Sequence, residues 1–215
     1  LKNETFKNLT RLKHLFLSDN KINFIEYNAF NNLIDLRTLN LDSNPIERLD
    51  FIENLPSLVD LSLIGCNLKL IFKTYFNFLN NLEIIKIASN GIQKFEEFVF
   101  MNLKNLKYLN IVNEKIIFLD KEIFKGLEKN KLKLNLNSNY IEKIYNYTFV
   151  YLENLIELHL GFNHIYFIEA NAFNFMKFLT ILDLKHNRLK SLENGIFKNL
   201  LNLIDLYLLN NQIRN

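Results

Sequence analysis

The chain has 215 residues, of which 49% are hydrophobic and 23% are charged, and its formal net charge is +3. This composition is that of a folded protein and excludes a disordered or collagen-like chain. The small, evenly interleaved charge gives no reason to expect binding to nucleic acid, and no apolar run approaches the ~20 residues of a membrane-spanning helix. Leucine and asparagine occur 41 and 35 times, an excess that indicates a repeated unit.

An eleven-residue pattern, L-x-x-L-x-L-x-x-N-x-L, returns along the whole chain, most often after 24 residues. Two copies, which start at Leu58 and Leu106, carry Cys66 and Glu114 in place of the asparagine. A further copy around Leu134 has one extra residue in front of it. The copies with leucine or isoleucine at every apolar position and asparagine at the polar one start at Leu12, Leu36, Leu82, Leu155, Leu179 and Leu203.

Each copy contains an L-x-L segment that predicts a short strand, with its leucines pointing inward and the other residues outward. In chain order, the outward residues run from His14 and Phe16 in the first copy to Asp205 and Tyr207 in the ninth. Stacked coils would pair these strands in a parallel sheet about 4.8 Å apart and join the leucines into one core. A coil of 24 residues is too short for a strand and a substantial helix, so we expect loops or single turns opposite the sheet.

The asparagine of each copy falls where the chain leaves the sheet. Its amide can donate to and accept from backbone groups that a buried turn would otherwise leave unpaired. We expect these side chains to stack as a ladder, and a series of mostly phenylalanine residues to stack on the opposite, convex side. The predicted ladder consists of Asn20, Asn44, Asn90, Asn139, Asn163, Asn187 and Asn211.

The 24-residue coil and the Asn-Ala-Phe form at 28–30 and 171–173 resemble the typical extracellular subclass of leucine-rich repeats, found in Toll and Toll-like receptors, Slit and adhesion-type ectodomains. The predicted fold is an α/β-type solenoid that is mostly β. It is an open, right-handed horseshoe of about nine coils with a parallel concave sheet. It forms a single domain over residues 1–215.

The resemblance also implies an extracellular or cell-surface location, a protein ligand or receptor partner, and a possible homo- or heterodimer. The cysteine-rich caps that are usual in this subclass are missing from both ends of the sequence. We therefore expect an internal fragment of a longer ectodomain, which reaches the membrane only through segments outside this chain.

The variable outward positions are the candidates for recognition, because the core positions are committed to packing. Aromatic and apolar side chains beside polar ones on a sheet surface are typical of protein-binding sites. We therefore expect ligand binding on the concave face, and the carboxylates of its C-terminal part favour a partner with a basic patch. The alternative is that the apolar residues only cover their neighbours and that Lys133 and Glu157 form only an ion pair. The candidate residues are His14, Phe16, Tyr108, Glu157, His159, Phe162, Asp183, Asp205 and Tyr207.

The sequence contains no nucleophile motif, phosphate-binding glycine loop or metal-ligand spacing. We therefore expect no enzymatic activity, no metal and no cofactor. Cys66 is expected to be buried and inert. Three sequons mark Asn3, Asn8 and Asn146 as candidate glycosylation sites.

Three functions fit these repeats. The first is a protein-binding ectodomain fragment of a Toll-like or adhesion-type receptor, with a role in innate immunity or cell adhesion. The second is a structural leucine-rich protein of the extracellular matrix, and the third is an intracellular leucine-rich scaffold. We favour the first because the coil type resembles that of receptor ectodomains.

Overall fold

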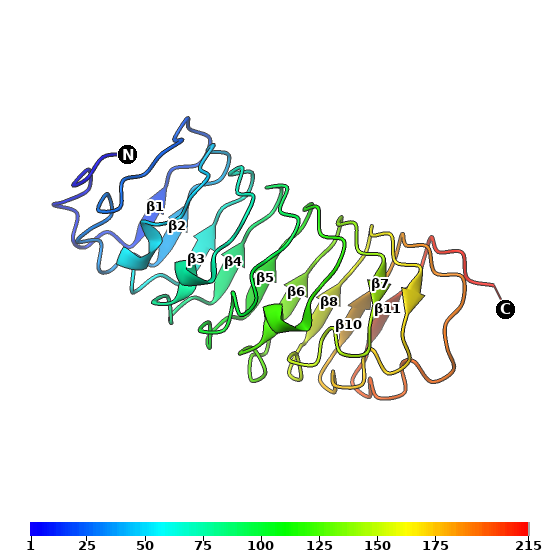
Figure 1. The fold of residues 1–215 in the computed structure, drawn as a ribbon. Helices are drawn as coiled ribbons and strands as arrows, with labels where there is room; N and C mark the ends of the chain where they lie inside the picture. Colours follow the sequence, from blue (N-terminus) through cyan, green and yellow to red (C-terminus); the bar gives the residue numbers. More distant parts are fainter. Residues whose placement is uncertain (215) are drawn as a thin grey trace.

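Nine short strands form one parallel sheet in the computed structural model, which describes residues 1–214. Each strand is centred on a leucine or isoleucine of the repeat, and the strand order in the sheet follows the chain (Figure 1). The molecule is therefore an elongated stack of coils with its two ends far apart. The strands are β1 (His14–Phe16), β2 (Thr38–Asn40), β3 (Asp60–Ser62), β4 (Ile84–Lys86), β5 (Tyr108–Asn110), β6 (Lys133–Asn135), β8 (Glu157–His159), β10 (Ile181–Asp183) and β11 (Asp205–Tyr207).

The strand register places each repeat position on the same position of the next coil. Leu158 lies opposite Leu182, and Leu134 lies opposite Leu109. The register is thus kept in the coil that carries the extra residue. The central side chains are fully buried from β2 to β10. A single coil cannot bury its own apolar face, so these contacts between coils supply the stability. The predicted mostly-β solenoid is confirmed.

The side opposite the main sheet is made of loops and short elements. It carries three 3₁₀ helices, η1 (Ile52–Asn54), η2 (Lys73–Phe76) and η3 (Lys121–Phe124), and a separate parallel pair formed by β7 (Lys143–Ile144) and β9 (Phe167–Ile168). No longer helix occurs in residues 1–214, as the coil length predicts. The phenylalanine series stacks as expected, with ring centroids 6.0 Å apart for Phe76 and Phe100 and 6.1 Å apart for Phe124 and Phe149.

The asparagine ladder forms in the interior coils. The Nδ2 group of Asn163 donates to the carbonyl oxygens of Leu136 and Leu160 at 3.0 and 3.1 Å, and its Oδ1 atom accepts from the backbone N–H of Ile141 at 3.0 Å. One side chain thus satisfies backbone groups in two adjacent coils. Asn44, Asn90, Asn139 and Asn187 make equivalent buried contacts.

The two outermost members of the predicted ladder differ from the rest. Asn20 is exposed and bonds only to carbonyl groups of its own coil, because β1 has a neighbour on one side only. Asn211 is half-buried but still bonds to the preceding coil. Cys66 occupies a ladder position, and its Sγ atom lies 3.2 Å from the Leu41 carbonyl oxygen. Burial raises the pKa of this thiol to about 11, so the thiolate form is disfavoured at neutral pH.

Glu114 also occupies a ladder position and is 1% exposed. Its carboxylate accepts hydrogen bonds from the backbone N–H groups of Asn90 and Ile92 at 2.8 and 2.6 Å. Unlike asparagine, an ionised glutamate cannot donate to the carbonyl group of the preceding coil. Burial raises the pKa of Glu114, although these backbone hydrogen bonds oppose the shift. The buried site therefore disfavours the charged form of Glu114 and suits a neutral amide better.

The raised pKa of Glu114 makes stability depend on pH in a defined direction. A carboxyl group whose folded pKa lies above its unfolded value stabilises the fold fully below the unfolded pKa, and this contribution is lost as the pH rises through the folded pKa. Glu114→Asn, which restores a neutral donor and acceptor, is therefore expected to gain stability relative to the parent between pH 5 and pH 8, by about 1 kcal/mol at pH 8. Urea unfolding at pH 5, 6.5 and 8 measures this gain. The exposed control Glu97→Gln should show no such trend, and a variant curve parallel to that of the parent would contradict the assignment.

Candidate functional site: the concave face and its edge

The concave face presents most of the predicted binding residues on strand positions that point away from the core. His14 and Phe16 lie on β1, and Phe16 is 67% exposed. The Nδ1 atom of His14 lies 3.0 Å from the Thr38 hydroxyl on β2. In the C-terminal coils, Tyr207 on β11 is 41% exposed. The remaining predicted residues of this face, at half-buried positions on β5, β8 and β11, are Tyr108, Glu157, His159 and Asp205.

Glu157, on the C-terminal part of the concave face, is paired within the protein. The Nζ atom of Lys133 lies 2.6 Å from Glu157, across the β6–β8 pair. The Nε2 atom of His159 lies 3.4 Å from the same carboxylate. Partial burial acts to raise the pKa of Glu157, but hydrogen bonds from Lys133 and His159 lower it overall. Glu157 is therefore not a free negative charge for a partner.

Asp183 does not behave as the sequence predicts. It lies on β10 but is only 2% exposed. Its Oδ1 atom accepts from the Lys185 backbone N–H and its Oδ2 atom binds the Lys185 ammonium, each at 3.0 Å. A Cβ atom at Gly161 would lie 3.2 Å from both carboxylate oxygens, so the missing side chain leaves room for this ion pair. Asp183 is thus buried and paired with Lys185. Of the three carboxylates predicted for the C-terminal part of the concave face, Asp205 is the one that has no ion pair among residues 1–214.

Phe162 lies beyond the end of β8, on the turn that leaves the sheet. Its ring stacks on that of His186 in the next coil, with centroids 4.2 Å apart and an interplanar angle of 12°. The ammonium group of Lys185 lies 5.7 Å from the Phe162 ring and 5.8 Å from the Tyr207 ring. Phe162 therefore belongs to the edge of the sheet rather than to its concave surface. The Lys185 ammonium group is close to both Phe162 at this edge and Tyr207 on the concave face.

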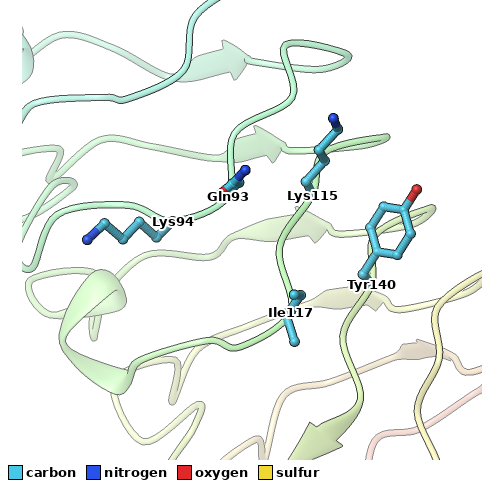
Figure 2. Close-up of a pocket in the computed structure, with 5 residues that line it drawn as sticks. All are labelled: Gln93, Lys94, Lys115, Ile117 and Tyr140. Atoms are coloured by element: carbon cyan, nitrogen blue, oxygen red, sulfur yellow. The ribbon is translucent and has the colours of Figure 1, made fainter.

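A hollow of about 480 Å³ opens along the loops that follow the strands. Figure 2 shows its five lining residues on loops of successive coils. Tyr140 also packs edge-on against His164, with ring centroids 5.3 Å apart. This edge was not predicted as a site, although its aromatic and histidine residues directly precede or follow ladder asparagines in the sequence. The lining residues are Gln93, Lys94, Lys115, Ile117 and Tyr140.

The three sequon asparagines, Asn3, Asn8 and Asn146, are all exposed. The backbone N–H of Asn146 donates to Glu169 at 3.0 Å, while Thr148 of the same sequon is buried. No group of three or more histidine, cysteine or carboxylate side chains in the described part of the chain is arranged to hold a metal ion. Within residues 1–214, no helix has the length and hydrophobicity to cross a membrane.

Known proteins share this sequence pattern and fold. The leucine rich repeat family model matches residues 1–46, 56–116, 80–133, 104–165 and 132–189. The chain is 31% identical to osteomodulin of Bos taurus, over 98% of this chain and 44% of that protein. It is 34% identical to Toll-like receptor 3 of Homo sapiens, over 96% of this chain and 19% of that protein. The chain thus spans less than half the length of these two relatives.

Solved structures agree with these matches. The TLR13–ssRNA13 complex has a TM-score of 0.79 at 29% identity, over 95% of this chain and 33% of that one. The Drosophila Toll–Spätzle complex has a TM-score of 0.80 at 20% identity, over 95% of this chain and 32% of that one, and at this identity it supports the fold alone. The repeat pattern, the parallel solenoid and the match to the family model together show that the chain belongs to the leucine-rich repeat family, whose members include Toll-like receptors, keratocan and osteomodulin.

Proposed function

We propose that this chain is part of the extracellular, ligand-binding region of a Toll-like or adhesion-type receptor, and that a protein partner binds its concave face. The observation that carries the proposal is the position of Tyr207, which is 41% exposed on β11, the end strand that pairs with β10. A rigid sheet loses little conformational entropy on binding. Tyrosine is among the residues that most often dominate interface energy.

The charges on the concave face limit the class of partner that it can attract. Because Glu157 and Asp183 are paired with Lys133 and Lys185, attraction of a basic partner rests on Asp205 alone. We therefore expect binding through burial of Tyr207 and of the half-buried Ile181, which lies opposite Asp205 on the adjacent strand, with a weak dependence on salt. The paired concave lysines also favour a protein over nucleic acid, whose phosphates need free cations.

Two observations favour a second candidate, a structural protein of the extracellular matrix. Osteomodulin and keratocan match 98% and 95% of this chain. A receptor is expected to continue into a membrane-spanning segment and a signalling domain, whereas a matrix protein is not. The full reading frame therefore decides between the two. For either candidate, we expect glycans on Asn3, Asn8 and Asn146 when the protein is secreted.

A selection from a displayed library of folded protein domains tests the concave face without knowledge of the natural ligand. The immobilised chain is the bait, and the affinities of the selected binders are then measured on Tyr207→Ala and on the control Lys177→Ala, an exposed residue outside the strands of the sheet. We expect most binders to lose at least tenfold in affinity on Tyr207→Ala and to be unaffected by Lys177→Ala. If most binders respond to Lys177→Ala instead, the concave face is not the preferred binding surface.

A further inference from the structure

The residue directly before the ladder position has a left-handed backbone in all nine coils, with φ between 52° and 66°. Glycine tolerates this conformation and asparagine, aspartate and histidine are enriched in it, whereas a bulky side chain such as that of phenylalanine is strained there. The seventh and eighth coils carry ring side chains at this position, Phe162 and His186 at φ 56° and 52°, and Phe162 is the strained residue of the row. The row consists of Asp19, Ser43, Gly65, Ser89, Asn113, Ser138, Phe162, His186 and Asn210.

Phe162 and His186 are neighbours, and burial in the core does not compensate for the strain at Phe162. Phe162 is 48% exposed, and its ring stacks on that of half-buried His186. The Nδ2 atom of Asn210 lies 3.1 Å from the Nε2 atom of His186. Phe98, the other aromatic residue with a positive φ, is half-buried, and the ammonium group of Lys125 lies 5.0 Å from its ring. Strain at exposed residues that the core does not need is a feature of functional sites.

The stacked pair of Phe162 and His186 continues into a larger surface on the same side of the solenoid. Tyr140 and His164 follow the ladder positions of the sixth and seventh coils and pack edge-on at 5.3 Å. Tyr140 also borders the hollow in Figure 2, beside the exposed side chain of Ile117. The term "aromatic edge" is used below for Ile117, Tyr140, Phe162, His164, His186 and Arg188.

The charges around the aromatic edge differ from those on the concave face. Lys86, Lys133 and Lys185 on or beside the concave strands all have a carboxylate partner. Lys115, which lines the hollow, and Arg188 have no carboxylate within 4.0 Å in residues 1–214. An apolar surface with unpaired cations is complementary to a ligand that carries both apolar and acidic groups.

We propose that the aromatic edge is a second binding surface, distinct from the concave face, for an acidic polypeptide segment. An apolar side chain of the partner occupies the hollow against Ile117 and Tyr140. Its carboxylates meet Lys115, Arg188 and the positively polarised ring edges. A protein segment fits better than single-stranded nucleic acid, because bases bind to free ring faces, whereas the Phe162 ring is stacked on His186 and has the Lys185 ammonium group 5.7 Å from its centroid.

Labelled peptides test the chemistry directly. The probes are a fluorescein-labelled ten-residue peptide of alternating aspartate and tyrosine, its asparagine–tyrosine counterpart and a ten-nucleotide single-stranded RNA, and fluorescence anisotropy measures the affinities. We expect the acidic peptide to bind at least tenfold more tightly than either other probe. Its affinity should also fall as salt is raised.

The double variant Phe162→Asn, His186→Asn tests whether peptide binding depends on the aromatic edge. Asparagine is already present in the row at Asn113 and Asn210, so it suits the backbone. We expect the thermal midpoint to stay the same or rise, and affinity for the acidic peptide to fall at least tenfold. Ser138→Ala in the same row and Tyr207→Ala on the concave face should leave peptide affinity unchanged.

Three results would overturn the proposal: equal binding of the acidic and amide peptides, tighter binding of the RNA, or unchanged affinity in the double variant. A large fall in the thermal midpoint of the double variant would also count against it, because the two rings would then serve packing. Loss of peptide binding on Tyr207→Ala alone would assign the peptide to the concave face instead.

Discussion

Leu182→Ala is expected to lower the free energy of unfolding by about 2–5 kcal/mol. The side chain is fully buried and lies between Leu158 and Leu206 of the adjacent strands. Its removal deletes core contacts on both sides and leaves a cavity in a stack of coils that cannot close around it. Urea denaturation measured by circular dichroism gives the loss.

The neighbouring residue supplies a matched control for this prediction. Ile181 is on the same strand but points away from the core and is only half-buried. Ile181→Ala should therefore cost clearly less than Leu182→Ala. Equal losses would mean that the inward and outward faces of β10 have been assigned wrongly.

Asn163→Ala is expected to cost about 1–3 kcal/mol, because the change leaves buried backbone groups of two coils without partners. The amide donates to Leu136 and Leu160 and accepts from Ile141. Asn163→Asp tests the donor role separately, since aspartate keeps the acceptor but cannot donate when ionised. Both variants are measured by urea unfolding at pH 7.

An exposed asparagine distinguishes the ladder from asparagine content in general. Asn80 is exposed, so Asn80→Ala should change stability by no more than a few tenths of a kcal/mol. If Asn163→Ala is as mild as Asn80→Ala, the ladder contributes little to stability. If Asn163→Asp matches the parent chain, the hydrogen bonds that the Asn163 amide donates are dispensable.

The concave site is where prediction from sequence was least complete. Periodicity places Asp183 on the outward side of its strand, and the structure confirms this placement but buries the side chain against Lys185 over Gly161. The repeat pattern specifies which way a side chain points, but not whether a neighbour covers it. Burial depends on contacts between residues of adjacent coils, such as the 3.2 Å separation that a Cβ at Gly161 would have from the Asp183 carboxylate.

The sequence by itself determined the coil length, the strands, their parallel order and the interior ladder, because each follows from a spacing that recurs along the chain. Only the tertiary structure decided which charges are paired, and it alone revealed the left-handed row that carries Phe162 and His186. The physical reason is that periodicity encodes the path of the backbone. The strain of a bulky side chain and the stacking of two rings depend on the dihedral angles at each position and on the side chains that adjacent coils bring into contact.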